Sequence, residues 1–372
     1  MPAGDTFEHR WHRLISGDSR GPLPSLARVG LTALSGLYWL GLKGNHALCN
    51  LRLRRQTRPA LPVISLGNLS VGGTGKSVAV RYVARELISR GLRPGIVLRG
   101  HRREDASQVI LASDGQGTIA SLALTGDEAA EHLRALPEVP VAVGKRREQA
   151  IELLAAAGVQ VAILDDGFQY FRMARDWDIV LISARLDLRT ARLLPRGVLR
   201  EPWSHLRRAD QVWITHADEV TADQLAAVQA AVARVVPHQT PVLARHASAG
   251  IATLQGADVP LENLRNLPVI AMSGLGSPGS FESSLAALGA RVTPLRYADH
   301  HHYQPADWLQ VCDTAERAGA TVVVTTEKDA VKLPEGAPLP VWVLRTQLQI
   351  MTGKEQVLAG LEQFPGETEP EA

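Results

Sequence analysis

Cysteine is almost absent from this 372-residue chain, in which only Cys49 and Cys312 occur, 263 positions apart. Two such distant cysteines give neither a disulfide framework nor the closely spaced pairs of a metal ribbon, so we predict a reducing, cytoplasmic compartment. Aromatic residues are also scarce, at 5%. Because no stacking motif accompanies the basic residues, the sequence predicts no nucleic-acid partner.

Long hydrophobic runs are missing as well. No charge-free stretch reaches the roughly 18 residues that a membrane-spanning helix requires. The first twenty residues contain acidic side chains and no apolar segment, so we predict that they are not a secretory signal. What is present is a globular composition, 45% hydrophobic and 21% charged, which excludes a disordered, collagen-like or polytopic membrane protein. At about 100–200 residues per domain, the length predicts two domains.

The N-terminal segment, residues 1–58, differs in charge from the rest of the chain. It carries nine basic and three acidic residues, a net charge of +6, whereas the remainder has a net charge of −4. This asymmetry predicts an anionic surface or substrate near the N-terminus. Within the segment, Val29–Leu42 is charge-free and mostly apolar over 14 residues. This is too short to span a bilayer, and two interpretations remain open: a buried core helix, or a helix lying in the membrane interface.

After Pro59, short apolar runs alternate with helical patterns, which predicts an α/β fold with a doubly wound parallel sheet. Strands are expected at Pro62–Leu66, Gly95–Leu98, Val139–Val143, Val159–Leu164 and Ile179–Ile182, and helices at Ser77–Arg90, Asp127–Leu136 and Arg146–Ala157. The pattern weakens around Thr240–Leu254, and a second set of runs then predicts a smaller α/β domain. Its expected elements are Val269–Met272, Phe281–Leu288, Val292–Leu295, Ala306–Ala318, Thr321–Thr325 and Val341–Leu344.

The strongest motif is the segment SVGGTGKS at residues 70–77, which follows a predicted strand and opens a predicted helix. It matches the phosphate-binding pattern G-x-x-x-x-G-K-[ST], except that Ser70 replaces the first glycine. The glycines let successive backbone N–H groups surround phosphate oxygens, and the helix directs its positive end at the same anion. Lys76 is expected to reach the β- and γ-phosphates, and the Ser77 hydroxyl to hold Mg²⁺. The residues expected to bind a nucleoside triphosphate are Ser70, Val71, Gly72, Gly73, Thr74, Gly75, Lys76 and Ser77.

A second motif, Val161–Gln169 (VAILDDGFQ), is an apolar strand that ends in two carboxylates. Beside a P-loop, such a strand end is the expected place for an aspartate that supports Mg²⁺. Adjacent acids repel each other unless a cation lies near them. We expect Asp165 or Asp166 to bind the metal, directly or through water, and the other to act on the nucleophile. The alternative is an exposed Asp-Gly turn.

Phosphoryl transfer to an alcohol also needs a group that accepts the proton, which contributes about 10²–10⁴ in rate. Asp127 and Glu128 stand at a predicted helix start, where they are alternatively simple helix caps. The run Asp299–Tyr303 (DHHHY) has three interpretations: an imidazole oriented by an aspartate, a solvated loop, or a zinc site, although adjacent histidines lack the spacing of H-x-x-x-H. The basic loops 99–103 and 145–147 are phosphate contacts or solvated charge. No N-K-x-D segment for binding guanine occurs.

In their order along the chain, these motifs resemble those of the tetraacyldisaccharide 4'-kinases, the lipid A 4'-kinases. The resemblance rests on Ile64–Ser77 (ISLGNLSVGGTGKS), Leu98–Gly100 (LRG), Gly126–Glu128 (GDE), Leu164–Gln169 (LDDGFQ), Leu194–Pro202 (LPRGVLREP), Asp299–His300 and Thr325–Lys332 (TTEKDAVK). It extends from about residue 14 to residue 345, nearly the whole chain. The serine at position 70 is itself similar to the family, whose members carry Ser or Thr there.

The resemblance implies a Gram-negative bacterial enzyme that uses ATP and Mg²⁺. It would move the γ-phosphate of ATP to the 4'-hydroxyl of an acylated glucosamine disaccharide 1-phosphate, at the cytoplasmic face of the inner membrane. Because such a lipid lies at the bilayer, the interfacial interpretation of Val29–Leu42 is favoured, with the Arg52–Arg58 cluster near anionic headgroups at about 1 kcal/mol for each basic residue. We expect a monomer in peripheral contact with the membrane.

The same resemblance implies the roles of individual residues. The residues expected to take part in catalysis are Lys76, Asp127, Asp166 and His300, among which Asp127 and His300 resemble a dyad that takes the proton from the sugar hydroxyl. The expected metal ligands are Ser77, Asp165 and Asp166. Supporting roles around the nucleotide and metal are expected of Glu128, Arg200 and Glu201.

The expected organisation has four parts: a basic N-terminal segment with the interfacial helix (1–58), a P-loop kinase domain (59–240), a smaller α/β domain with linker strands (241–350), and a C-terminal helix with an acidic tail (351–372). The sequence departs from the family pattern at His101, Ala129 and Arg196, and Arg196 is a candidate for an extra phosphate contact. Two other functions remain open: a P-loop ATPase that couples hydrolysis to assembly or metal delivery, and a membrane-surface adaptor that binds nucleotide without chemistry.

Overall fold

The computed structural model describes residues 7–51, 56–100, 103, 105, 107–117, 120–299 and 301–364. The chain divides into two compact units, each assembled from separate stretches of sequence. Unit 1 comprises Met1–Lys76, Leu164–Arg245 and Ile350–Pro365, and unit 2 comprises Ser77–Ile163, His246–Gln349 and Gly366–Ala372. The four-part division expected from the sequence stays a prediction. The acidic tail beyond residue 364, His300, and Arg52, Arg54 and Arg55 of the basic cluster lie outside the described residues.

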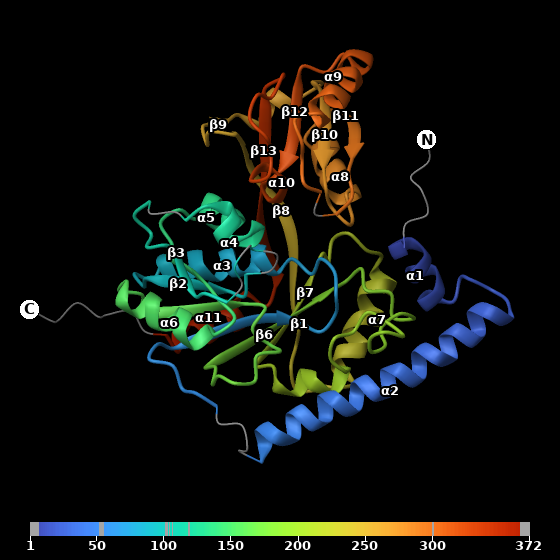
Figure 1. Cartoon of the computed structure of the whole chain (residues 1–372), viewed down its shortest axis with the longest axis vertical. Helices are drawn as coiled ribbons and strands as arrows, with labels where there is room; N and C mark the ends of the chain where they lie inside the picture. Colours follow the sequence, from blue (N-terminus) through green and yellow to red (C-terminus); the bar gives the residue numbers. More distant parts are fainter. Residues whose placement is uncertain are drawn as a thin grey trace, which may run out of the picture. The chain divides into compact units, whose positions relative to one another are not determined.

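Unit 1 contains a parallel arrangement of buried strands in the order β8-β7-β6-β1. Its strands are β1 (Val63–Asn68), β6 (Trp177–Ser183), β7 (Gln211–Thr215) and the start of β8 (Val242–Thr253). Its helices are α1 (Phe7–Ser16), α2 (Pro22–Asn50), the 3-10 helix η1 (Trp203–Arg208), α7 (Ala222–Ala233) and α11 (Lys354–Glu362) (Figure 1). Apolar side chains of β6, β7 and α7 pack into one core together with Ile15 of α1.

Unit 2 contains two groups of strands. In the first, β2 (Pro94–Leu98) and β4 (Val141–Val143) pair in parallel, and β3 (Ile110–Ser113) pairs with β4 antiparallel. In the second, the parallel order is β11-β10-β12-β13, formed by β10 (Pro268–Ser273), β11 (Arg291–Arg296), β12 (Val322–Thr326) and β13 (Val341–Thr352). The short strand β9 (Asp258–Val259) pairs with β8 antiparallel, and β5 (Val161–Asp165) ends at the acidic pair.

The helices of unit 2 alternate with these strands along the chain. They are α3 (Lys76–Ile88), α4 (Leu122–Thr125), α5 (Asp127–Ala135), α6 (Arg147–Ala156), η2 (Leu261–Leu264), α8 (Gly279–Ala287), α9 (Asp307–Ala318) and α10 (Glu327–Ala330). The alternation of helices with mostly parallel strands confirms the expected α/β class. The segment Thr240–Leu254, where the apolar pattern of the sequence weakens, contains a twelve-residue strand, β8. Most of its side chains are only partly buried, so the strand has no continuous apolar run that would mark it in the sequence.

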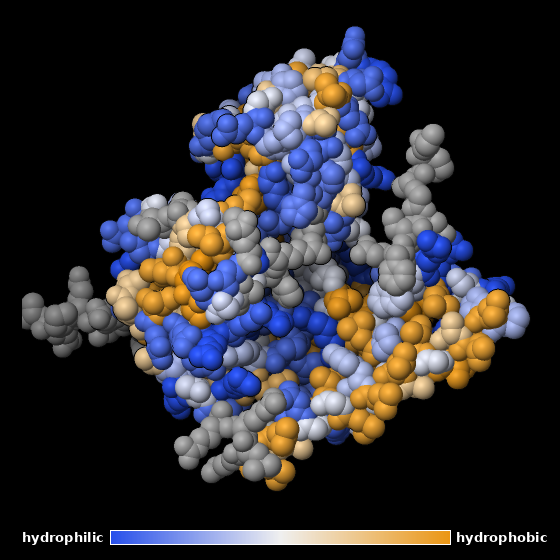
Figure 2. All heavy atoms as spheres, viewed as in Figure 1, coloured by the Kyte–Doolittle hydropathy of each residue, from blue (hydrophilic) through white to orange (hydrophobic). Residues whose placement is uncertain are grey.

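The N-terminal helix α2 is twice as long as its apolar core predicts, with 29 residues instead of 14. Ser35 is buried and Leu31 packs against the core of unit 1, but the apolar side chains on the rest of the helix face solvent. Leu23, Leu26, Val29, Leu34, Leu37 and Leu40 are between 52% and 78% exposed. Figure 2 shows these apolar residues gathered along α2. The interpretation of Val29–Leu42 as a buried core helix is therefore wrong. In the described part of the chain, no helix combines the length and apolarity needed to cross a membrane.

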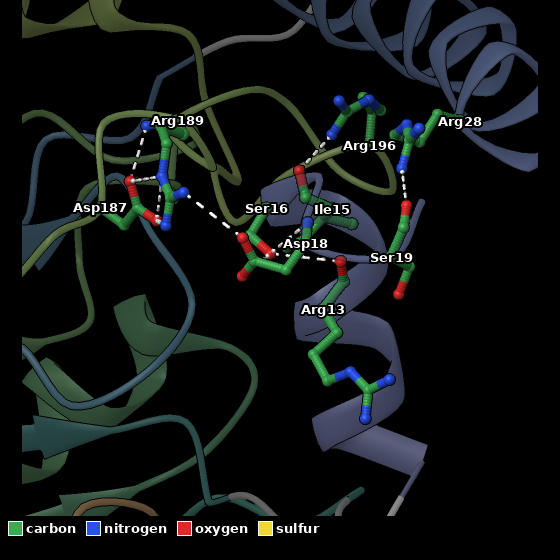
Figure 3. Close-up of polar contacts among 9 residues, drawn as sticks. All are labelled: Arg13, Ile15, Ser16, Asp18, Ser19, Arg28, Asp187, Arg189 and Arg196. Carbon is green, nitrogen blue, oxygen red and sulfur yellow. Dashed lines mark hydrogen bonds and ion pairs between the residues drawn. The ribbon is translucent and has the colours of Figure 1, made fainter. Parts of the chain in front are cut away.

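Polar contacts join the end of α1 and the residues that follow it to the segment around residues 187–196 and to α2 (Figure 3). Arg196 Nη1 donates to the backbone oxygen of Ile15, near the end of α1, at 2.6 Å. Arg28 of α2 donates to the backbone oxygen of Ser19 at 2.8 Å. Arg196 is only 9% exposed. A cation at a helix C-terminus stabilises the free carbonyl groups there, so in this structure Arg196 supports α1, and the phosphate contact suggested by the sequence has no structural support.

Candidate active site

The glycine-rich segment forms the loop that its sequence predicts, between a buried strand and a helix. Strand β1 ends at Asn68, and α3 begins at Lys76. Gly72 and Gly75 have φ angles of +98° and +77°, a region that favours glycine. A Cβ added at Gly72 or Gly73 would meet nothing within 4 Å. The loop therefore presents backbone N–H groups and a helix N-terminus beside open space, which is the arrangement that binds phosphate.

Neighbouring segments of unit 1 hold this loop in place. Asn68 Nδ2 donates to Thr74 Oγ1 at 2.9 Å, and Thr215 Oγ1 donates to the backbone oxygen of Thr74 at the same distance. The backbone N–H of Val71 donates to the carbonyl oxygen of Val198 at 2.8 Å. A loop fixed at both ends is preorganised, so little conformational entropy is lost when an anion binds.

The side chain of Asp166 joins the phosphate loop to an arginine. Arg200 donates to both carboxylate oxygens of Asp166, at 2.7 and 2.9 Å, and Lys76 Nζ lies 3.5 Å from Oδ1 of the same carboxylate. Burial alone lowers the pKa of the Arg200 guanidinium, but the hydrogen bonds and charge of Asp166 raise it above its usual value. Asp166 also has a φ of +61°, which is uncommon for a residue other than glycine. Such conformations cluster at functional sites.

Each unit supplies one oxygen donor of the kind that magnesium binds. Asp165, at the end of β5, is 5% exposed, and Ser77 supplies a hydroxyl in the first turn of α3. Carboxylate and hydroxyl oxygens are the ligands that Mg²⁺ prefers together with substrate phosphates. Arg200 engages both oxygens of Asp166, which distinguishes the two acids that the sequence could not tell apart.

In unit 2, Asp127 is the first residue of α5 and is not its cap. The N-cap is Gly126, with a φ of +82° and no side chain that could cap the helix. Asp127 is half-buried and Glu128 is exposed. The positive end of a helix stabilises the ionised form of a carboxylate in its first turn. Asp127 therefore lies at the N-terminal end of α5 with partial access to solvent.

The histidine run lies in unit 2 after β11. Asp299 Oδ1 accepts a hydrogen bond from Lys328 of α10 at 2.8 Å. His301 Nε2 lies 2.9 Å from Asp307 Oδ2, and the His301 ring stacks on Tyr297 at 4.6 Å between centroids. These contacts give His301 a local structural role. Within the parts of the chain that are described, His301 and His302 join no group of three metal-binding side chains.

Two further predicted residues have structural partners. The side chain of Glu201 is completely buried and lies next to His205 Nδ1 at 2.5 Å and Arg208 Nη2 at 2.6 Å. Arg103 of the basic loop 99–103 is also buried and donates to the backbone oxygens of Gln108 and Val143. These contacts hold Arg103 in the fold, so it is not solvated charge.

Three comparisons with known proteins agree on one kinase family. A family described as "Tetraacyldisaccharide-1-P 4'-kinase" matches residues 27–363. The chain belongs to this family. Relatives named tetraacyldisaccharide 4'-kinase include one from Anaeromyxobacter dehalogenans, 39% identical over 92% of both chains, and one from Halothermothrix orenii, 33% identical over 86% of both chains. A crystal structure of LpxK from Aquifex aeolicus in complex with ATP has a TM-score of 0.71 and 27% identity, covering 91% of this chain and 99% of that one.

Membership in the tetraacyldisaccharide-1-P 4'-kinase family confirms the resemblance inferred from the seven motifs. It also confirms an α/β kinase that binds ATP and acts in lipid A biosynthesis. The alternative of a P-loop ATPase that drives assembly or metal delivery is not favoured, because the relatives are named as kinases.

Sequence reasoning missed a buried ion-pair cluster in this 4'-kinase. Arg81 of α3 is 1% exposed and lies 3.1 Å from Glu131 of α5 and 3.2 Å from Glu327 of α10. Burial raises the pKa of Glu327, whereas the charge of Arg81 lowers it. The available signal was the position of Arg81 directly between apolar residues of a predicted helix, because a buried arginine needs carboxylate partners. The cluster joins the phosphate-loop helix to the Thr325–Lys332 motif within unit 2.

Proposed function

We propose that this 4'-kinase moves the γ-phosphate of ATP to the 4'-hydroxyl of an acylated glucosamine disaccharide 1-phosphate, at the cytoplasmic face of the bacterial inner membrane. The observation that best supports the proposal is the position of Lys76. It stands directly after the glycine-rich loop, 3.5 Å from Asp166, and Arg200 binds that carboxylate with two hydrogen bonds. A cation held in this way can neutralise charge on the β- and γ-phosphates during transfer.

In the proposed site, backbone N–H groups of residues 70–75 bind the phosphate oxygens and Asp166 orients the ammonium group of Lys76. Ser77 and Asp165 would hold Mg²⁺. When bound, the ion would supply positive charge that offsets the negative charge of the phosphate oxygens. Arg200 offsets the charge of Asp166 and occupies both of its oxygens. Asp166 would therefore position Lys76 and compete little with Asp165 for the metal.

The proposed proton acceptor is Asp127, acting together with His300. The Asp127 carboxylate lies in the first turn of α5, from which it can attract the imidazole or the sugar hydroxyl. Taking the proton from the 4'-hydroxyl as it attacks the γ-phosphate lowers the barrier to forming the new P–O bond. Lys328, bound to Asp299, fixes the residue next to His300 in the chain.

The proposed membrane contact is the exposed apolar surface of α2. It carries six leucine and valine side chains that are more than half exposed. Tyr38 and Trp39 lie on the same helix, and the Tyr38 hydroxyl donates to the backbone oxygen of Arg200 at 2.8 Å. Amphipathic aromatic rings favour the headgroup boundary. The helix would lie in the membrane interface while one of its side chains contacts the segment that binds Asp166.

Changing Leu37 to glutamate tests this membrane contact. Leu37 is 65% exposed, so the substitution leaves the core intact. Burying a leucine side chain contributes about 1.5–3 kcal/mol, and we therefore expect vesicle binding to fall about 10- to 100-fold. Phosphoryl transfer to disaccharide embedded in anionic vesicles should fall in parallel, whereas transfer in detergent micelles with excess substrate should change little.

The matched control is Leu309→Glu, which places the same charge at a leucine of α9 that is 74% exposed. This variant should bind vesicles and phosphorylate the lipid like the parent chain. Equal vesicle binding by Leu37→Glu and Leu309→Glu would show that α2 does not contact the bilayer.

A further inference from the structure

Three side chains that can bind a metal converge in unit 1, outside the phosphate site. They are His46 of α2, Glu201, and His205 of η1. One ligand atom from each lies within 4.8 Å of the other two. The imidazole rings of His46 and His205 lie 4.3 Å apart between centroids. Two imidazoles and one carboxylate form a donor set typical of zinc sites.

Two buried atoms of this group that could bind a metal have no hydrogen-bond partner among the described residues. Glu201 is 0% exposed, yet its Oε1 has no hydrogen-bond partner among the described residues. His46 Nε2 is likewise buried and without a partner there. Leaving a buried acceptor unpaired costs about 1–3 kcal/mol, and more for a charged group. A cation bound to both atoms would remove that cost.

The surroundings of Glu201 match those of a metal-bound carboxylate. Arg208 Nη2 donates to Oε2 at 2.6 Å, which leaves Oε1 for a ligand. Carboxylates that bind metals are usually hydrogen-bonded through a second partner, which fixes their orientation. Arg208 is itself held over the rings of Phe168 and Phe171, at 4.0 and 4.5 Å from their centroids. The His46 ring also contacts Phe171, at 4.3 Å between centroids.

We propose that His46, Glu201 and His205 form a second metal site, selective for zinc-like divalent cations and separate from the magnesium site of the reaction. Imidazole nitrogens suit Zn²⁺, whereas Mg²⁺ prefers oxygen donors alone. Tetrahedral bonds of about 2.1 Å place ligand atoms about 3.4 Å apart, so small side-chain rotations bring the three atoms to their positions. His205 Nδ1 would exchange its contact with Glu201 for the metal, and a water would complete four ligands.

The bound ion would attach α2 to the segment that carries Arg200. His46 belongs to α2, and Glu201 directly follows Arg200 in the chain. The metal would therefore have a structural role, stabilising the apolar helix on unit 1. The proposal does not depend on the proposed reaction, because it concerns binding by the free protein.

The test measures zinc bound by the purified full-length chain, prepared without a histidine tag, stripped with chelator and dialysed against Zn²⁺ with millimolar Mg²⁺ present. We expect one Zn²⁺ per chain that Mg²⁺ does not displace. Co²⁺ used as a probe should give the intense visible absorption of a four-coordinate site, and Zn²⁺ should abolish that absorption. A chain that retains no zinc, or gives only the weak spectrum of six-coordinate Co²⁺, would overturn the proposal.

The variants His46→Gln and His205→Gln locate the site. Each should weaken Zn²⁺ binding at least about ten-fold, because loss of even an outer partner of a ligand costs 10- to 100-fold. His238→Gln, at an exposed histidine, is the matched control, and His301→Gln tests the histidine run. Unchanged affinity in both site variants would place the metal elsewhere and overturn the proposal. X-ray absorption of the zinc-loaded parent chain needs no variant and should show two imidazole ligands and no sulfur; any other ligand set contradicts the site.

Discussion

Replacing Lys76 with alanine is expected to lower the rate of phosphoryl transfer by at least about 10²–10³-fold, the effect of removing one preorganised charge donor from a reacting centre. The fold should survive, because Asp166 keeps both of its hydrogen bonds to Arg200, at 2.7 and 2.9 Å. The lysine is needed most when charge develops on the transferred group, so kcat should fall more than ATP affinity. Steady-state kinetics with ATP and the acylated disaccharide, together with direct nucleotide binding, measure both effects.

Lys354→Ala is a suitable control for this experiment. Lys354 is exposed at the first position of α11, also in unit 1, and its removal should leave transfer unchanged. Turnover of Lys76→Ala within a few-fold of the parent chain would contradict the assignment of the phosphate loop as the reacting site.

Replacing Asp127 with asparagine is expected to reduce kcat by about 10²–10⁴-fold, the usual contribution of a positioned general base. ATP affinity should change little, because the proposed role of Asp127 concerns the acceptor hydroxyl. His300→Gln should have a similar effect. If both residues act on one proton, the double variant should be scarcely slower than either single variant, since groups that act as a unit are not additive.

The control for Asp127 is Asp223→Asn. Asp223 is an exposed acid that also lies in the first turn of a helix, α7, but has no proposed role in the reaction. Its replacement should leave kcat unchanged. Full additivity of Asp127→Asn and His300→Gln, or near-normal turnover in both, would contradict the dyad.

The phosphate loop could be predicted from the sequence because its function depends on adjacent residues. Backbone N–H groups and the lysine belong to one turn, so residues 70–77 contain the whole signal. Asp165 and Asp166, at the end of β5 and directly after it, could be predicted for the same reason. The structure then separates them: Asp166 binds Arg200, which is 34 positions away, and sequence spacing contains no information on that pairing. The role of His300 stays a prediction, because it lies outside the described residues.

Contacts between distant segments could not be predicted. Arg81 and Glu327 are 246 positions apart, and although Glu327 belongs to the Thr325–Lys332 motif, nothing in that motif indicates its pairing with Arg81. The group of His46, Glu201 and His205 had only one visible sign, the four-residue spacing of Glu201 and His205, while His46 comes from another helix. The length of α2 was underestimated because four glycines and several polar residues interrupt its apolar pattern. By intrinsic helix propensity, each glycine in a helix interior costs about 1 kcal/mol relative to alanine. The stability of a helix in a protein depends on its packing as well, which the sequence pattern does not show.

Analysis of the reaction product tests the central claim most directly. The purified chain is incubated with γ-labelled ATP, Mg²⁺ and acylated glucosamine disaccharide 1-phosphate, and the lipid is examined by ³¹P NMR and mass spectrometry. The account predicts one new phosphomonoester on the 4'-oxygen for each ADP formed, with little ATP consumed when the disaccharide is absent. Release of labelled inorganic phosphate at the same rate with and without the disaccharide, and an unmodified lipid, would contradict it.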